Sequence, residues 1–82
     1  MIEWKESKEK LETTLKFKNF SEAFAFVSEM AIKAEDAQHH PEIHWNYNTI
    51  TLTLTTHDRG SVVTRKDMEL AMELSQIYVD FT

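Results

Sequence analysis

The spacing of apolar residues changes abruptly near position 19 of this 82-residue chain, and this change constrains the fold more than any other feature. From Leu11 to Lys18, apolar and polar residues alternate, which is the pattern of a strand with one buried face. From Phe20 to Ala37, apolar residues recur every three or four positions, as they do on one side of a helix. The sequence therefore predicts a strand that leads directly into a long helix.

Asn19 stands at this junction and is a good helix N-cap, with Glu22 three residues later as in a capping box. The predicted helix has an apolar stripe made of Phe20, Ala23, Phe24, Val27, Met30, Ala31 and Ala34. Phe26 and Ile32 widen the apolar arc beyond one face. Because a chain of this size buries only about 60% of its unfolded surface, we expect the second face to meet another subunit. A homodimer or homotetramer through the Phe20–Ala37 helix and the sheet edges is the expected assembly.

Alternation in the rest of the chain predicts a short strand over 2–5 and two more strands over 43–47 and 50–54. Asn48 and Thr49 separate the last two, so they predict a hairpin in which Tyr47 pairs with Ile50.

A second helix is predicted to start at Thr64–Asp67, where Asp67 also suits the positive end of the helix dipole. Its apolar stripe consists of Leu70, Ala71, Leu74, Ile77, Tyr78 and Phe81. The element order is then β-β-α-β-β-α. This order predicts an α+β domain, with an antiparallel four-stranded sheet and helices packed on one of its faces.

Composition narrows the class of protein further. The chain has no Cys, which excludes disulfides, thiolate metal sites and a catalytic thiol. Its net charge is −5 and no basic stripe is present, so we expect no direct binding of nucleic acid. No apolar run approaches the ~18 residues of a membrane span, and the opening residues do not contain the apolar run of a signal peptide, so neither is expected. We expect a single domain over 1–82, located in the cytoplasm and not on a membrane.

All four histidines lie between positions 39 and 57, which makes this segment the first place to look for proton transfer. If Tyr47 pairs with Ile50, extension of the same ladder places His40 opposite His57. His39, His40 and His57 are therefore expected to converge, and Asp67 could hydrogen-bond one of the imidazoles.

Other roles for these residues compete. A His at the end of a helix often serves only the helix dipole, and His44 is expected on the polar side of its strand. A metal site is not expected, because Pro41 interrupts any helix through His40 and His44, and zinc usually takes three or four ligands. For Trp4, Trp45 and Tyr47, packing in the core or on the sheet is favoured over stacking on a ligand.

The segment Glu35–Glu42 resembles the signature of the pterin-4a-carbinolamine dehydratases, in which an acid and three residues precede His-His-Pro. The signature continues with an aromatic residue at Tyr47, a His at His57 and an Asp at Asp67. The flanking segments 17–24 and 54–58 are also similar to the family, and the resemblance extends from about Trp4 to the final helix.

The resemblance implies a hydro-lyase that dehydrates 4a-hydroxytetrahydrobiopterin to a quinonoid dihydropterin during recycling of tetrahydrobiopterin, without cofactor or metal. By this analogy His39 and His57 act as acid and base in an order left open, His40 holds the pterin, and Asp67 orients His57. The substrate-binding residues implied are His39, His40, Pro41, Thr56, His57 and Asp58.

Some members of the family act instead as dimerisation cofactors of transcription factors, and a dehydratase-like protein with another role is a further alternative. This chain also differs from the usual family pattern. Members usually have an additional N-terminal helix before the position of Trp4, which is expected to be missing here. Gln38 stands where Asp or Asn is common, and Arg59–Val62 replaces a more Gly-rich, apolar loop.

Overall fold

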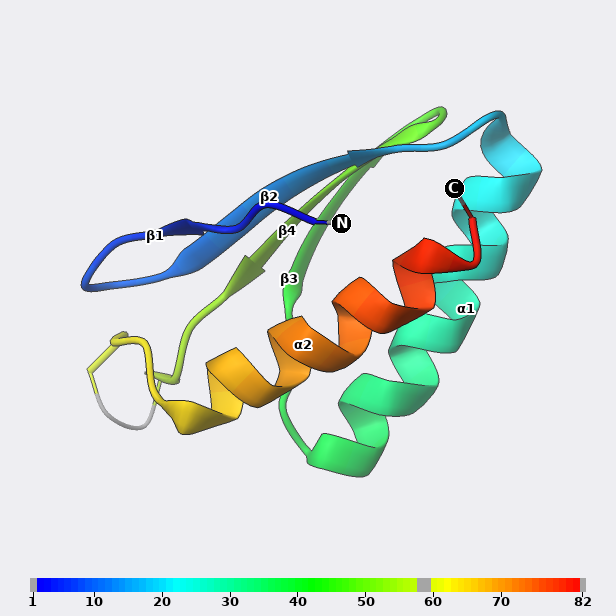
Figure 1. Cartoon of the computed structure of the whole chain (residues 1–82). Coiled ribbons are helices and arrows are strands. Elements are labelled where there is room, and N and C mark those ends of the chain that lie inside the picture. The colour runs from blue at the N-terminus through cyan, green and yellow to red at the C-terminus, as the bar shows by residue number, and fades with distance from the viewer. Residues whose placement is uncertain (1, 58–59, 82) are drawn as a thin grey trace.

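The computed structural model describes residues 2–57 and 60–81. The elements follow the predicted order, with strands β1 (Lys5–Glu6), β2 (Leu11–Lys16), β3 (Glu42–Asn46) and β4 (Thr49–Leu54), and helices α1 (Phe20–Ala37) and α2 (Arg65–Val79). The strands form one antiparallel sheet in the order β1-β2-β4-β3. Both helices cover the same face of this sheet (Figure 1). The predicted α+β fold is therefore confirmed.

The predicted helix starts are confirmed in their main features. Asn19 has an extended backbone, and its side-chain oxygen accepts a hydrogen bond from the Glu22 backbone N–H at 2.9 Å. At the start of α2, the Thr64 backbone N–H donates to the Asp67 carboxylate at 2.8 Å. These bonds satisfy N–H groups that would otherwise lack partners at the start of each helix.

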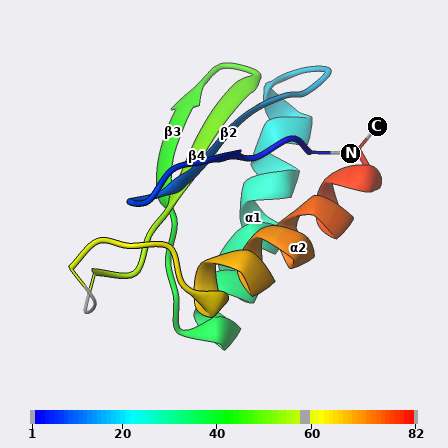
Figure 2. The ribbon, with the colours of Figure 1, turned by 60° about the vertical axis from the view of Figure 1, so that its left-hand side comes forward.

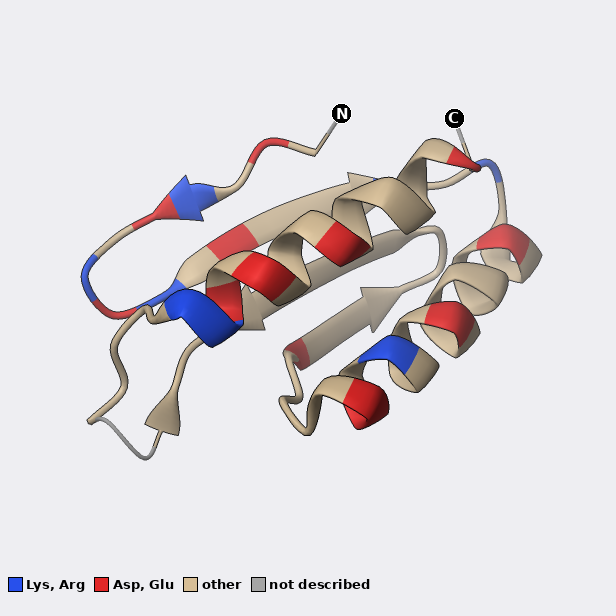
Figure 3. Ribbon diagram, turned by 60° about the horizontal axis from the view of Figure 1, so that its bottom comes forward, with Lys and Arg blue, Asp and Glu red and all other residues tan. Residues whose placement is uncertain are grey.

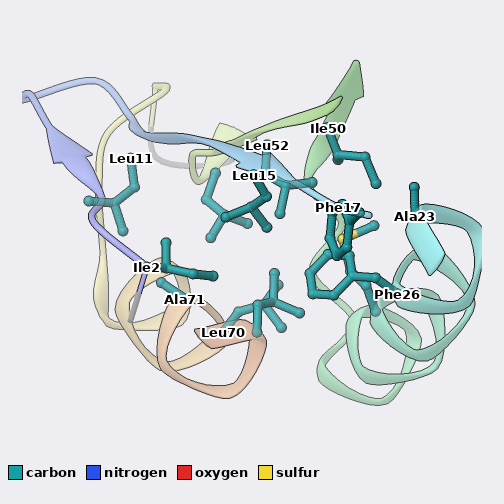
Figure 4. Packing of buried hydrophobic residues seen from close by; sticks show 13 residues of the cluster. Ile2, Leu11, Leu15, Phe17, Ala23, Phe26, Ile50, Leu52, Leu70 and Ala71 are labelled. Carbon is teal, nitrogen blue, oxygen red and sulfur yellow. The ribbon is translucent and has the colours of Figure 1, made fainter. Parts of the chain in front are cut away.

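The core lies between the sheet and the two helices (Figure 4). Strands contribute alternate residues such as Leu15, Ile50 and Leu52, and α2 contributes the predicted stripe, with Leu70, Ala71 and Leu74 buried. The buried face of α1 differs from the prediction in part, because Ala23, Met30 and Ala34 of the predicted stripe are buried together with Phe26.

Phe26 is fully buried and packs near Phe17 and Phe81, whereas Phe20 and Phe24 are more than half exposed. The sequence pattern places Phe20 and Phe24 on the main stripe and Phe26 beside it, which is wrong. Phe20 and Phe24 instead stack on Trp45 of the edge strand β3, with ring centroids 4.8 and 6.1 Å apart. When the apolar arc of a helix is wide enough to contact two surfaces, residue spacing alone does not determine which side of the helix packs on the sheet.

The predicted hairpin register is also wrong. Trp45, rather than Tyr47, pairs with Ile50, and the turn consists of Tyr47 and Asn48. Asn48 explains the shift, because its carbonyl oxygen and its side-chain amide both bond the backbone of Phe17 at 2.9 Å. The turn is thus held by the chain that follows strand β2. The shift equals two residues, so the faces of the strand residues are unchanged.

The N-terminal strand is shorter than predicted and begins later, at Lys5 rather than Ile2. Residues before it are held by side chains instead of a backbone ladder. Ile2 is buried in the core, the Glu3 carbonyl accepts from the Thr13 hydroxyl at 2.8 Å, and the Trp4 indole N–H donates to Ser75 at 3.1 Å. The packing expected for Trp4 is confirmed.

Charge is distributed unevenly over the helical side of the molecule. Acidic residues recur along both helices, whereas the basic residues of α2 lie together in its first turn (Figure 3). Within the described residues, no helix combines the length and apolarity that a membrane crossing requires.

The burial of α1 leads to a stability prediction with a matched control. Met30 in α1 is fully buried, whereas Met72 in α2 is 64% exposed. Met30→Ala should lower the free energy of unfolding by about 2–5 kcal/mol because it opens a cavity in the core. Met72→Ala should change it by less than about 0.5 kcal/mol. Urea unfolding of both variants tests this, and equal losses would contradict the assignment of the core.

Candidate functional site

The first part of the site is the chain that leaves α1. Gln38 adopts a left-handed conformation (φ 53°), and its backbone N–H bonds the Glu35 carbonyl. The His39 backbone N–H bonds the Ala34 carbonyl at 3.1 Å, which completes a Schellman motif. A further bond joins the Gln38 side-chain amide to the Glu35 carbonyl at 2.8 Å. These bonds set the direction in which His39 and His40 leave the helix.

The second part is the start of α2, which lies next to the end of α1 (Figure 2). Asp67 of α2 is completely buried, and its Oδ1 lies 2.5 Å from Nε2 of His39, whose side chain is 11% exposed. The other oxygen, Oδ2, accepts from the Thr56 hydroxyl at 2.7 Å and from the Thr64 backbone N–H at 2.8 Å. Asp67 therefore joins three segments: the end of α1, the end of β4 and the start of α2.

Two opposing effects act on the pKa of Asp67. Burial is the largest and would raise the pKa, because it disfavours the charged form. Hydrogen bonds from His39, Thr64 and Thr56, together with the charge of His39, outweigh burial and lower the pKa below its ordinary value. Asp67 is therefore a carboxylate at neutral pH and a strong acceptor for the His39 imidazole.

The third part carries the other two imidazoles. His40 lies at the surface with its Nε2 2.7 Å from Oε1 of Glu35, and both side chains are more than half exposed. His57 follows β4 and is exposed at the start of a loop. Backbone bonds between Thr56 and Val62 close the base of this loop. Among the residues that the structure describes, the His57 ring has no polar partner.

A depression of about 290 Å³ brings these groups together, and its lining residues are Gln38, His39, His40, Thr55, Thr56, His57 and Lys66. The predicted convergence of three histidines is thus confirmed. It does not depend on pairing of His40 with His57 in the sheet, because the β3–β4 ladder ends at the Glu42–Thr53 pair. A larger hollow of about 880 Å³ lies between the N-terminal segment and β2. Its lining contains no histidine, so we place the candidate site in the smaller depression.

One predicted hydrogen-bond partner differs from the one in the structure. Asp67 bonds His39 and not His57, because the chain that leaves α1 passes over the first turn of α2. His44 lies exposed on the strand face that carries Thr51, outside the depression, as predicted. Pro41 is not among the lining residues. The predicted substrate contact Asp58 lies outside the described residues.

Sequence reasoning does not single out Thr55, Thr64 or Lys66 as part of the site. It identifies Thr64 only as a helix cap and Lys66 only as part of a helix start. The sequence feature that points to Lys66 is its position next to Asp67 in the first turn of α2. Polar residues of this kind have no spacing pattern that separates them from ordinary surface residues.

The lowered pKa of Asp67 predicts a pH-dependent contribution to stability. Because the folded-state pKa lies below the unfolded value, ionised Asp67 stabilises the fold above the ordinary pKa of about 4, and this is lost as pH falls through the folded value. Asp67→Asn should lower the free energy of unfolding by about 1–3 kcal/mol at pH 7. This difference from the unmodified protein should shrink steadily in urea unfolding series below pH 4. A difference that stays constant from pH 7 to the acid range would contradict the assignment.

The sequence and the fold both have relatives. The family model described as Pterin 4 alpha carbinolamine dehydratase matches residues 2–77. A protein of Trichormus variabilis, provisionally named a pterin-4-alpha-carbinolamine dehydratase, is 50% identical over 74 residues, which are 90% of this chain and 78% of the relative.

Two solved structures share the fold. A transcriptional coactivator/pterin dehydratase from Brucella melitensis superposes with a TM-score of 0.85 at 37% identity, covering 90% of this chain and 80% of the other. A pterin dehydratase-like protein identified as a RuBisCO assembly factor in the alpha-carboxysome has a TM-score of 0.74 at 17% identity, covering 93% and 87%. The second likeness concerns the fold alone.

The family model spans nearly the whole chain, and the three histidines of the predicted signature line one depression, with Asp67 behind His39. This chain belongs to the pterin-4a-carbinolamine dehydratase family.

Proposed function

We propose that this protein is a hydro-lyase that dehydrates 4a-hydroxytetrahydrobiopterin to the quinonoid dihydropterin, and so serves tetrahydrobiopterin recycling in the cytoplasm. The observation that carries the proposal is the convergence of His39, His40 and His57 on one depression, with a buried carboxylate behind His39. The family and the names of its relatives support the choice of a pterin carbinolamine as the substrate.

The reaction needs two proton transfers and no change of redox state. An acid donates a proton to the 4a hydroxyl, whose C–O bond then breaks and releases water. A base removes the proton from N5, and the N–H electron pair becomes the new C4a=N5 double bond. Each of these steps gains about 10²–10⁴-fold from a positioned group with a pKa near the working pH, and imidazole fits that requirement.

The three imidazoles differ in ways that suit different roles. His39 is nearly buried and held by Asp67, whereas His57 is exposed and has no polar partner among the described residues. His39 and His57 are therefore assigned the two proton transfers, and His40, which Glu35 anchors at the rim, is assigned to binding of the pterin. Pro41, Thr56 and Asp58 remain predicted substrate contacts.

Substitution of single histidines tests these roles in a turnover assay with 4a-hydroxytetrahydrobiopterin. His57→Ala should lower kcat by about 10²-fold or more, because it removes a proton donor or acceptor used in the transition state. His40→Ala should mainly raise KM. His44→Ala is the matched control, since it removes an exposed imidazole outside the depression, and it should leave both constants within about twofold of the unmodified values.

Two results would contradict the assignment if circular dichroism shows that the variants are folded. One is a loss in His44→Ala as large as that in His57→Ala. The other is near-normal turnover in a His39→Gln, His57→Ala double variant. His39→Gln is preferred to His39→Ala because an amide can still donate a hydrogen bond toward the buried Asp67.

A protein-interaction role is the second candidate, and the outer face of α1 favours it. Phe20, Phe24 and Ile32 are 52%, 57% and 63% exposed on this helix. The related Brucella melitensis protein is described as a transcriptional coactivator as well as a pterin dehydratase, which supports the same class of function. The two candidates differ in a simple way, because only the dehydratase requires His39, His40 and His57.

The same outer face supports the proposed homodimer or homotetramer. Antiparallel packing of two α1 helices about Ser28 would bring Phe24 of each copy to Ile32 of the other. The edge strand β3 pairs only with β4 in the described part of the chain, so a sheet edge is also open.

Light scattering should give a mass of at least twice the chain mass of 9.7 kDa. Ile32→Glu places a charge in the proposed contact and should shift the mass toward the monomer. Met72→Glu, at an equally exposed site on α2, should leave the mass unchanged. A 9.7 kDa particle at micromolar concentration of the unmodified protein would contradict the proposal.

A further inference from the structure

The depression that holds the histidines also contains a cation that the proposed proton transfers do not use. Lys66 lies in the first turn of α2 and is one of the lining residues. Successive residues of a helix point about 100° apart. Lys66 is accordingly exposed, whereas the next residue, Asp67, is buried against His39. Lys66 therefore belongs to the wall of the depression, and Asp67 supports that wall from inside the protein.

The charge of Lys66 is not balanced by an acid in the same wall. None of the lining residues carries a carboxylate. Two carboxylates lie next to lining residues, and both already have an imidazole partner. Asp67 accepts from His39 inside the protein. Glu35 accepts from His40 at the surface. The polar groups of the wall are thus neutral or basic.

The neighbouring cation shows a different arrangement. Arg65 lies 3.5 Å from Glu69 on the same helix, and it does not line the depression. In the described part of the chain, no ion pair joins Lys66 to a carboxylate. Asp58 and Arg59, which lie outside that part, have opposite charges and cancel in the count. A chain of net charge −5 thus has a locally positive depression.

The covalent structure of a pterin indicates which part of it meets this cation. In a 4a-hydroxytetrahydropterin, the new double bond forms between C4a and N5, and the side chain is carried by C6, which is bonded directly to N5. A histidine that takes the proton from N5 therefore has the side chain of the substrate next to it. Lys66 and the histidines line one depression of about 290 Å³, so the side chain lies on the same wall as Lys66.

The ring and the side chain differ in what they need from the protein. The pterin ring is uncharged, and its carbonyl and N–H groups can be matched by neutral polar groups. Gln38 and Thr55 supply such groups in the same depression. A lysine ammonium is instead a full point charge, and it forms its strongest hydrogen bonds with phosphate or carboxylate oxygens. An unbalanced Lys66 is therefore suited to an anionic side chain rather than to the ring.

We propose that Lys66 is a specificity-determining residue that binds an anionic group, a phosphate or a carboxylate, on the side chain at C6 of the pterin. This inference rests on the proposed function and narrows its substrate class. The dehydration itself is unchanged, because Lys66 takes part in neither proton transfer. The side chain of 4a-hydroxytetrahydrobiopterin has only hydroxyl groups, so that compound is a substrate with a lower kcat/KM than an anionic pterin.

Turnover of three 4a-hydroxytetrahydropterins tests the inference. Their side chains end in a hydroxyl, a carboxylate or a phosphate monoester and are otherwise matched. For the unmodified protein, kcat/KM should be about tenfold higher for the anionic substrates than for the neutral one, chiefly through KM. The larger of the two anionic values distinguishes phosphate from carboxylate. The preference should shrink in about 1 M NaCl, because salt screens interactions between exposed charges.

Substitutions at two adjacent positions show whether Lys66 causes the preference. Lys66→Gln should lower kcat/KM by about tenfold for the anionic substrates and much less for the neutral one. Lys66→Arg keeps the charge and should keep the preference. Arg65→Gln is the matched control, because it removes a cation of the same helix turn that lies outside the depression. The ratio between substrates is compared, since a change in folding or in the imidazoles affects all three alike.

Binding of oxidised pterins, which do not react, gives a readout without turnover. In fluorescence titrations of the unmodified protein, pterin-6-carboxylate should have a Kd about tenfold lower than 6-hydroxymethylpterin. Lys66→Gln should bring the two Kd values together, and Arg65→Gln should leave them apart.

Three results would overturn the inference. One is an equal kcat/KM for charged and neutral pterins in the unmodified protein. Another is a preference that survives Lys66→Gln. The third is an equal loss for all three substrates in Lys66→Gln, since Lys66 would then act on the ring or on the reacting groups. Absence of turnover with every substrate would instead defeat the proposed function. The binding titrations would still decide whether Lys66 selects an anionic side chain, and a protein that binds neither pterin would overturn both proposals.

Discussion

The structure depends on one buried carboxylate, that of Asp67. Taking an ionised group out of water is costly, and the cost is offset only when the group is fully hydrogen-bonded. Asp67 meets this condition with donors from three different segments: His39 after α1, Thr56 after β4 and Thr64 before α2. Each of these segments is at the end of a helix or strand, so one side chain sets the relative positions of the elements at this end of the molecule.

The apolar core and the polar cluster around Asp67 have different structural roles. Phe26, Met30, Leu52 and Leu74 are fully buried and bring both helices onto one face of the sheet. Apolar packing has no direction, however, and it would tolerate small rotations of a helix that a 2.5 Å contact does not. The core therefore brings the segments together, and the Asp67 cluster orients the imidazole that the proposed chemistry uses.

Helix α1 shows how a small chain divides its apolar residues between two surfaces. One face enters the core through Ala23, Phe26 and Met30. The other keeps Phe24 and Ile32 exposed, and neither of them lines the depression that holds the histidines. Catalysis and association would thus use different parts of the molecule, and a change in one need not disturb the other.

The sequence by itself determined the order of the elements, the bounds of α1, both helix caps and the cluster of histidines, because these features depend on residues within a few positions of one another. Only the tertiary structure decided which face of α1 is buried, that Trp45 pairs with Ile50, and that Asp67 bonds His39 rather than His57. The reason is physical. Side-chain period and capping are local properties, whereas each of these outcomes depends on a contact between segments distant in sequence, such as Asn48 with Phe17 or Asp67 with His39. A local pattern is compatible with several such contacts, and only packing of the whole chain selects one.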